Sequence, residues 1–177
     1  INDYINTFKV AGLIVVKDDK ILYENYNFGN DEKSKWMSFS VTKSVTSMLI
    51  GAAIKDGFIK SVNDPVSTYV TDLNRGNYSN VSIEDVLQMS SGIDWNEDYA
   101  DPNSDVNIAS GFNDTKLYSY LNKLEVSNKP GTKFNYNTAE SNVIGGIVRA
   151  ATGQNLSTYL EKKMWQPFGL EFDAYWA

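Results

Sequence analysis

Ser40 and Lys43 are the two residues whose types and spacing most directly suggest chemistry. They stand three positions apart in the segment Ser40-Val41-Thr42-Lys43. If this segment begins a helix, the two side chains share one face, because residues i and i+3 have Cβ atoms about 5–6 Å apart. A serine hydroxyl needs a base to become a nucleophile, and an uncharged lysine amine can be that base. The pair therefore predicts nucleophilic catalysis by Ser40 with Lys43 as base.

The S-x-x-K spacing is common, and its ordinary alternative is a helix-capping serine beside a solvated lysine. The residues that follow favour chemistry, since no charged residue occurs from Ser44 to Ile54. A helix that is apolar or small on every side is expected to be buried on every side. Burial would disfavour the ammonium form of Lys43 and lower its pKa. We therefore predict a buried helix from Val41 to Asp56, ended by Gly57.

The composition removes the more common types of hydrolytic site. The chain of 177 residues contains no histidine and no cysteine. This excludes Ser-His-Asp and Cys-His catalysis, disulfides and nearly all transition-metal sites, so a base must come from Lys, Tyr, Asp or Glu. The net charge of −6 disfavours nucleic-acid binding. The longest charge-free apolar stretch, residues 48–54, is shorter than the roughly 20 residues of a membrane span, and no signal peptide is visible.

The elements that must position Ser40 and Lys43 are a β-hairpin followed by helices. Strands are predicted at Val10–Val16, deeply buried, and at Ile21–Tyr26. Further helices are predicted, in chain order, from the cap Asn63-Asp64-Pro65 through Tyr69, from the capping box Ser82–Asp85 to about Met89, over 114–124 and 139–152, and from Asn155 to an end at Trp165-Gln166-Pro167. Residues 95–113 are predicted to form a long polar loop. Two strands followed by helices indicate an α+β fold.

A two-stranded hairpin is not a stable sheet by itself, so further strands are expected. The residues after Asn113 do not supply them in an obvious way. The chain also lacks an initiator methionine, which indicates processing or excision from a longer protein. We expect residues 1–177 to form a single, incomplete domain.

Several segments together resemble the penicillin-binding-protein/β-lactamase fold, and within it the class C-like serine hydrolases. This group comprises class C β-lactamases, D-Ala-D-Ala carboxypeptidases, esterases and 6-aminohexanoate-dimer hydrolases. The segments that carry the resemblance span nearly the whole chain and lie at residues 36–44, 54–57, 64–66, 86–92, 130–136 and 165–170. The S-x-x-K motif occurs in such enzymes. The resemblance implies a β-lactamase/transpeptidase-like fold, of which this chain holds the N-terminal hairpin and the helical region.

The resemblance also assigns the second family motif, Tyr-x-Asn or Tyr-x-Ser, to Tyr136, whose phenol would be the proton shuttle. The pattern is weak by itself, because Asn also follows two residues after each of Tyr4, Tyr23, Tyr78 and Tyr120. The preceding Pro-Gly-Thr-Lys-Phe selects Tyr136. A phenol beside Lys43 would titrate with it as a coupled pair, and either group could take the Ser40 proton. Position 138 is Thr, whose hydroxyl can donate one hydrogen bond to substrate but lacks the second contact of an amide.

Two further features bear on the substrate. Residues 94–99 resemble a loop that places a tyrosine beside the substrate in amide-hydrolysing members, so Tyr99 is a candidate contact and a surface aromatic is its alternative. The family's third motif, Lys-Thr-Gly or a variant such as His-x-Gly, supplies the second oxyanion N–H. It is not found after Tyr136, so we expect the missing motif and strands to lie beyond this chain.

The resemblance implies a serine hydrolase that cleaves a small-molecule ester or amide through an acyl-enzyme on Ser40, without metal or cofactor. A β-lactamase or D-Ala-D-Ala carboxypeptidase is the alternative, and Thr138 and the loop at residues 96–99 disfavour the β-lactamase. A catalytically silent binding module on the same fold is a further alternative, motivated by Thr138 and the absent third motif. The resemblance favours a bacterial periplasmic or secreted protein, and the sequence is also compatible with a cytoplasmic location. The sequence does not determine the oligomeric state.

Overall fold

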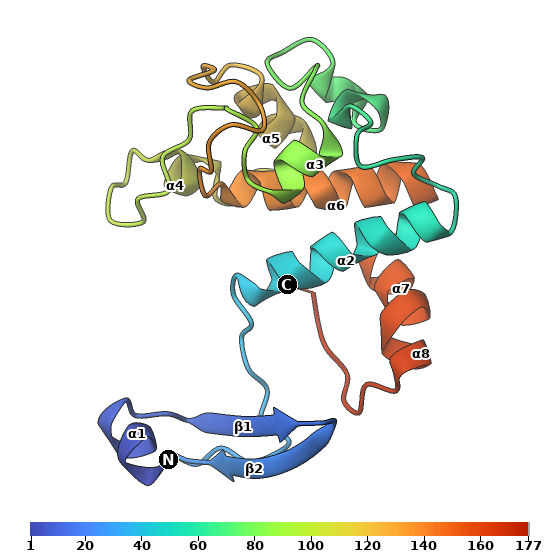
Figure 1. Cartoon of the computed structure of the whole chain (residues 1–177). Coiled ribbons are helices and arrows are strands. Elements are labelled where there is room, and N and C mark those ends of the chain that lie inside the picture. Colours follow the sequence, from blue (N-terminus) through green and yellow to red (C-terminus); the bar gives the residue numbers. More distant parts are fainter. Residues whose placement is uncertain (177) are drawn as a thin grey trace. The chain divides into compact units, whose positions relative to one another are not determined.

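The computed structural model describes residues 1–176, so Ala177, the last residue of the predicted domain, lies outside the described part. The chain divides into two compact units (Figure 1). The first comprises residues 1–39 with 172–174, and the second comprises residues 40–171 with the chain after residue 174. That these residues belong to one incomplete domain stays a prediction.

The first unit contains the predicted hairpin. Strands β1 (Gly12–Lys17) and β2 (Lys20–Tyr26) pair antiparallel. The turn between them places Asp18 and Asp19 at φ of 51° and 58°, which matches the right-handed twist of the strands. A short helix, α1 (Asn2–Thr7), precedes β1 and was not predicted. The hairpin is therefore confirmed, with strand ends shifted by one or two residues.

The deep burial predicted for the first strand is wrong. Ile14 and Val16 of β1 are 49% and 59% exposed, and Ile21 and Leu22 of β2 are 60% and 62% exposed. β-Branched and apolar composition indicates a strand that is suited to burial. It does not supply the layer that covers the strand, and these side chains remain about half exposed or more.

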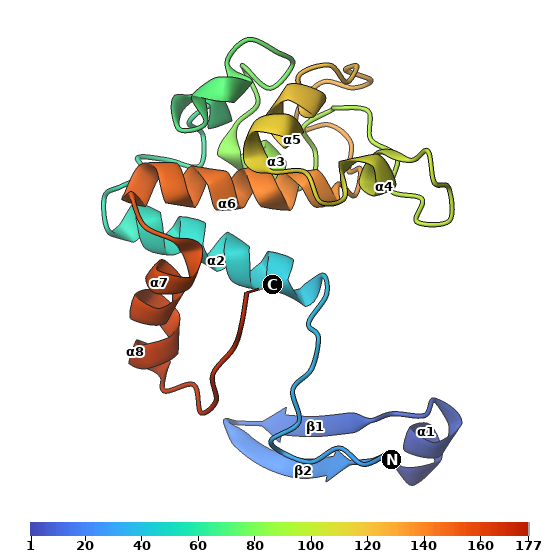
Figure 2. The same ribbon diagram turned by 180° about the vertical axis from the view of Figure 1, so that it is seen from behind.

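The second unit is built around α6 (Thr138–Thr152), which lies beside α2 (Val41–Lys55) in both views (Figures 1 and 2). Three short helices that precede α6 in the chain also pack against it. They are α3 (Ile83–Leu87), α4 (Asp105–Ala109) and α5 (Asp114–Leu121). The remaining elements are the 3₁₀ turns η1 (Val66–Thr68) and η2 (Thr71–Leu73), α7 (Leu156–Leu160), the π-helical segment η3 (Glu161–Trp165) and α8 (Gln166–Phe168). Within the described residues, no helix is both long and apolar enough to cross a membrane.

Helix α6 forms where the sequence predicts it. The Asn137 side chain accepts a hydrogen bond from the Glu140 backbone N–H at 3.3 Å, which caps the first turn. Gly153 ends the helix in the left-handed conformation at φ of 67°. The apolar residues Ala139, Val143, Ile144, Ile147 and Val148 are buried. These side chains make α6 the central packing element of this unit.

Helix α2 has the predicted extent, but the prediction that every side is buried is wrong. Leu49 and Ala53 are fully buried, whereas Ser44, Met48 and Gly51 are exposed. In the described residues α2 packs chiefly against α6. The charge-free face that carries Ser44, Met48 and Gly51 therefore has no matching packing partner within the described residues.

The shorter helices follow their local signals to different degrees. The capping box is confirmed, since Ser82 Oγ accepts from the Asp85 N–H at 3.1 Å and Asp85 Oδ2 accepts from the Ser82 N–H at 3.0 Å. The predicted loop over 95–113 contains α4, which Ser104 caps. The last helical run continues through Pro167, because this residue lies in the first turn of α8, where a missing N–H costs little.

Candidate active site

The first turn of α2 holds Ser40 and Lys43 in contact. Lys43 Nζ donates a hydrogen bond to Ser40 Oγ at 3.2 Å. Ser40 occupies the N-cap position, but its side chain accepts no capping hydrogen bond. The alternative of an ordinary capping serine is therefore not observed. Because Ser40 is exposed, its hydroxyl is open to an incoming molecule.

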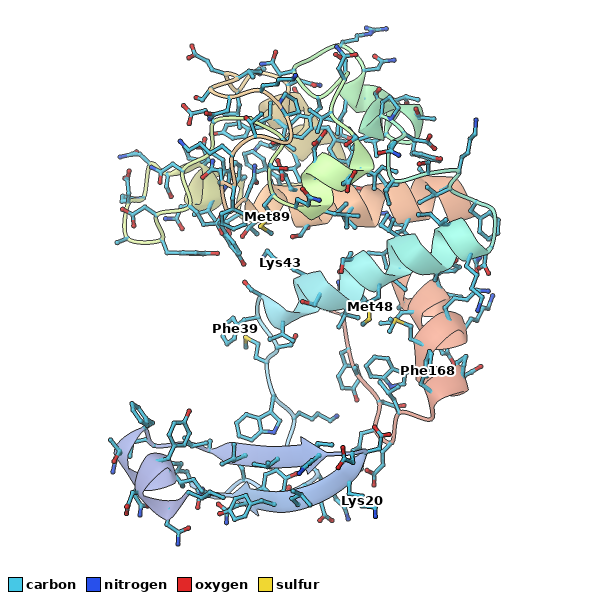
Figure 3. The ribbon with its side chains drawn as sticks, in the orientation of Figure 1. Lys20, Phe39, Lys43, Met48, Met89 and Phe168 are labelled. Carbon is cyan, nitrogen blue, oxygen red and sulfur yellow. The ribbon has the colours of Figure 1, made fainter. Side chains whose placement is uncertain are left out.

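Tyr136 approaches the same lysine from the segment before α6. Lys43 Nζ lies 5.3 Å from the centroid of the Tyr136 ring, which is a cation–π distance. Figure 3 shows Lys43 extending from α2 toward α6. The Asn135 N–H donates to the Met89 carbonyl at 2.8 Å and so ties the Tyr136 segment to the turn after α3. The structure thus brings Ser40, Lys43 and Tyr136 together.

Lys43 is only half-buried, so the burial predicted for this lysine is observed in part. The reason is its position in the first turn of α2, close to the exposed Ser40. Its surroundings are a hydroxyl and an aromatic face. This environment differs from the enclosed apolar pocket that the charge-free helix suggested.

Tyr99 and Thr138 meet at the edge of this site. The Tyr99 hydroxyl lies 3.4 Å from Thr138 Oγ1, although 39 positions separate the two residues in the sequence. Thr138 is the first residue of α6, and Tyr99 lies in the segment before α4. Both side chains therefore lie close to the segment that carries Tyr136.

Glu97 joins the two residues, and sequence reasoning did not single it out. Its carboxylate accepts hydrogen bonds from the Thr138 hydroxyl, the Thr138 N–H at 3.0 Å, the Tyr99 hydroxyl at 2.8 Å and the Trp95 indole N–H. Partial burial would raise the pKa of Glu97, but the hydrogen bonds from Thr138, Trp95 and Tyr99 outweigh it and lower the pKa. Glu97 and Thr138 are 41 positions apart, so no local sequence pattern links them. The one local signal was an acidic residue between the aromatic residues Trp95 and Tyr99.

Acidic residues are frequent near this site, but they do not form a metal centre. Within residues 1–176, no group of three or more Asp or Glu side chains is arranged to hold a metal ion. The groups that the structure holds in contact at this site are the hydroxyl of Ser40, the amine of Lys43 and the ring of Tyr136.

The comparison with protein families gives one match that covers almost the whole chain. A family model described as Beta-lactamase matches residues 5–175. A curated relative, the 6-aminohexanoate-dimer hydrolase of Paenarthrobacter ureafaciens, is 32% identical over 164 residues. The match covers 85% of this chain and 41% of the relative, so this chain spans less than half of the relative's length.

Solved structures show the same fold. A class C beta-lactamase superposes with a TM-score of 0.76 at 21% identity, covering 96% of this chain and 47% of that one. The octameric penicillin-binding protein homologue from Pyrococcus abyssi superposes with a TM-score of 0.72 at 21% identity, covering 99% of this chain and 43% of that one. These comparisons confirm the predicted β-lactamase/transpeptidase-like fold.

Proposed function

Because this chain belongs to the beta-lactamase family, we propose that it carries the nucleophile and the proton-transfer groups of a serine hydrolase. The observation that carries the proposal is the contact of Lys43 Nζ with Ser40 Oγ at 3.2 Å, with the Tyr136 ring centroid 5.3 Å from the same nitrogen. A nucleophile in hydrogen-bond contact with a base that a third group orients is the arrangement required for covalent catalysis.

The proposed reaction has two halves. Ser40 Oγ attacks the carbonyl carbon of an ester or amide while its proton passes to the uncharged Lys43 amine or to the Tyr136 phenolate. The proton then reaches the leaving alcohol or amine, which departs and leaves an acyl-enzyme. Water attacks this ester, and its proton returns through the same pair, so that the acid is released and the Ser40 hydroxyl is restored.

We place the substrate among small esters and amides. The relative's name, 6-aminohexanoate-dimer hydrolase, supports hydrolysis of a small molecule. The Thr138 hydroxyl donates to Glu97, so it is not free to donate to a substrate carbonyl as an Asn amide would be. Thr138 stands where the family's second motif has Asn or Ser, and this departure supports an ester or amide over a β-lactam.

Intact-mass spectrometry after exposure to a fluorophosphonate probe tests the nucleophile. We expect one adduct on the chain, no adduct on Ser40→Ala, and an unchanged adduct on Ser44→Ala, which removes an exposed hydroxyl from the next turn of α2. Absence of an adduct from a chain that circular dichroism shows to be folded would contradict the proposal. A penicillin adduct on Ser40 that is released slowly would favour the β-lactamase alternative.

A further inference from the structure

Glu140 is a buried acid that the proposed reaction does not use. It lies in the first turn of α6, four positions after Tyr136, and is 1% exposed. Acidic side chains are almost never fully buried unless they are paired, because the charged form loses its solvation by water. A buried carboxyl this close to a candidate catalytic group therefore points to a role at the site.

Polar side chains enclose this carboxyl. The Tyr78 hydroxyl donates to Glu140 Oε1 at 3.2 Å, and the Ser91 hydroxyl donates a second hydrogen bond. Tyr78, Ser91 and Asn137 are all buried as well. These three residues and Glu140 are here named the Glu140 cluster. Its members come from the segment before α3, the turn after α3 and the start of α6, so the carboxyl joins three parts of the chain.

The Glu140 cluster holds the chain on both sides of Tyr136. The Asn135 N–H donates to a carbonyl of the turn after α3 at 2.8 Å, and Ser91 lies in the same turn. Asn137 caps α6 by accepting a hydrogen bond from the Glu140 N–H at 3.3 Å. Tyr136 therefore lies between one residue that is tied to the turn of Ser91 and another that is tied to Glu140.

The protonation of Glu140 can change near neutral pH. Burial raises its pKa from 4.5 to about 7, while hydrogen bonds from Ser91 and Tyr78 oppose the rise and the charge of Asp85 adds to it. Tyr78 stays neutral over this range, because burial and the charge of Glu140 raise its pKa. Both forms of the Glu140 carboxyl are therefore populated around neutral pH.

The charge that acts directly on Glu140 is that of Asp85 on α3. Glu97 also lies near the start of α6, but its lowered pKa keeps it ionised around neutral pH. Three other helices packed against α6 carry charged groups with partners of their own. Lys43 of α2 contacts Ser40, Asp105 of α4 accepts from the Tyr120 hydroxyl, and Asp114 of α5 pairs with Arg149.

We propose that Glu140 is a positioning residue whose neutral form keeps Tyr136 against Lys43 and whose ionised form releases Tyr136 and slows the attack by Ser40. A charge in this enclosed cluster is strongly destabilised and draws water to itself. The first turn of α6 must open to admit the water, and Tyr136, which precedes this turn, moves with it. This inference rests on the proposed serine hydrolase function.

The first measurement is the rate of fluorophosphonate labelling of Ser40 from about pH 5.5 to 8.5 in wild type and Glu140→Gln. Glutamine keeps an oxygen that can accept from Tyr78 and stays neutral at every pH. The ratio of the two rates cancels the titration of groups that both chains share. We expect the ratio of the variant's rate to the wild-type rate to rise with pH by about tenfold or more, because a pKa of about 7 leaves roughly 3% of the carboxyl neutral at the upper limit.

The matched control is Glu84→Gln, which removes an exposed acid from α3. Its labelling rate should keep a constant ratio to that of wild type across the same pH range. A purely structural role for Glu140 predicts a constant ratio for Glu140→Gln too, and that result would overturn the inference.

Tyr78→Phe tests which group titrates. The Tyr78 hydroxyl stabilises the ionised form of Glu140, and phenylalanine removes it while keeping the buried ring. The midpoint of the fall in labelling rate should therefore move to higher pH. A midpoint that stays in place or moves to lower pH would assign the titration to another group and overturn the inference.

A second measurement does not depend on the reaction. The NOE between the Tyr136 ring protons and the Lys43 Hε protons reports the contact in which Nζ lies 5.3 Å from the ring centroid. We expect this NOE to weaken in wild type as the pH rises through about 7 and to persist in Glu140→Gln. If wild type forms no adduct at any pH, the proposed function fails, and the NOE still decides whether Glu140 positions Tyr136. A wild-type NOE that does not change with pH would overturn the inference.

Discussion

At the scale of single residues, Lys43 connects the other two candidate catalytic groups. Its one nitrogen contacts both the Ser40 hydroxyl and the Tyr136 ring. A base must be able to lose its proton, which a guanidinium does not do at accessible pH. Lys43→Arg should therefore keep the charge at this position and lose the proton transfer.

We expect Lys43→Arg and Tyr136→Phe each to slow fluorophosphonate labelling of Ser40 by about 10²-fold or more. Lys55→Arg, in the last turn of α2, is the matched control and should label at the wild-type rate. The rate is measured from the growth of the adduct mass with time. Equal labelling of Lys43→Arg and wild type would show that the lysine is not the base.

Glu140 is a second residue with a measurable consequence. It is 1% exposed, and Oε1 accepts a hydrogen bond from the Tyr78 hydroxyl at 3.2 Å. Burial raises the pKa of Glu140 to about 7, while hydrogen bonds from Ser91 and Tyr78 oppose the rise and the charge of Asp85 adds to it. The neutral acid is therefore the form that the folded chain favours.

This pKa makes stability depend on pH. Below the ordinary value of 4.5 the acid is neutral in both states, and above 4.5 the unfolded state gains stability by ionising. Stability should fall by roughly 3.5 kcal/mol from well below pH 4.5 to well above pH 7, since the pKa rises from 4.5 to about 7 on folding and a difference of one in pKa is worth roughly 1.4 kcal/mol.

Urea unfolding across this pH range measures the dependence. Glu140→Gln should remove most of the decline, because its amide stays neutral at every pH. The Glu84→Gln control should keep it. A wild-type chain that gains stability from pH 4.5 to 7 would contradict the assignment.

At the scale of elements, the close packing of α6 against α5 depends on a glycine. A Cβ placed on Gly146 would lie 2.1 Å from the Tyr118 hydroxyl and 3.6 Å from a methyl carbon of Val70. A Cβ placed on Gly51, on the exposed face of α2, meets no atom within 4 Å. Replacing the glycine by alanine should therefore lower the stability of the chain at position 146 and raise it at position 51.

We expect Gly146→Ala to lower the free energy of unfolding by about 2 kcal/mol through overpacking. Gly51→Ala should raise it by up to about 1 kcal/mol, because alanine has the higher helix propensity. Chemical denaturation of both variants against wild type measures the two changes. A stabilising Gly146→Ala would mean that α5 and α6 pack less closely than described.

At the scale of the whole molecule, apolar side chains remain exposed in both units. In the first unit Val16, Ile21 and Leu22 are 59%, 60% and 62% exposed. In the second unit Phe168 is 76% exposed and Met48 is 49% exposed. Exposed apolar strands are templates for association. The chain also spans 41% of its curated relative's length.

We expect this chain to bind an apolar dye and to self-associate with rising concentration. Leu22→Lys should weaken the association, because it places a charge on the exposed strand β2. Glu32→Gln changes the net charge by the same amount at an exposed polar position and should not weaken it. Sedimentation velocity measures the effect, and a chain that stays monomeric at all concentrations would contradict the prediction.

The sequence by itself determined what depends on neighbouring residues. The hairpin, the capping box of Ser82 and Asp85, the extents of α2 and α6, and the S-x-x-K pair were all predictable, because turn, capping and i,i+3 geometry are local. The family resemblance was carried by segments of this kind and is confirmed by the match over residues 5–175.

Only the tertiary structure decided which surfaces are covered and which distant groups meet. It showed β1 exposed, α6 rather than α2 as the most enclosed helix, and Lys43 half-buried. It also showed that Glu97 accepts a hydrogen bond from the backbone N–H of Thr138, the first residue of α6, 41 positions away. Burial and long-range hydrogen bonds depend on how elements pack, and the periodicity of one element records only which face is suited to packing.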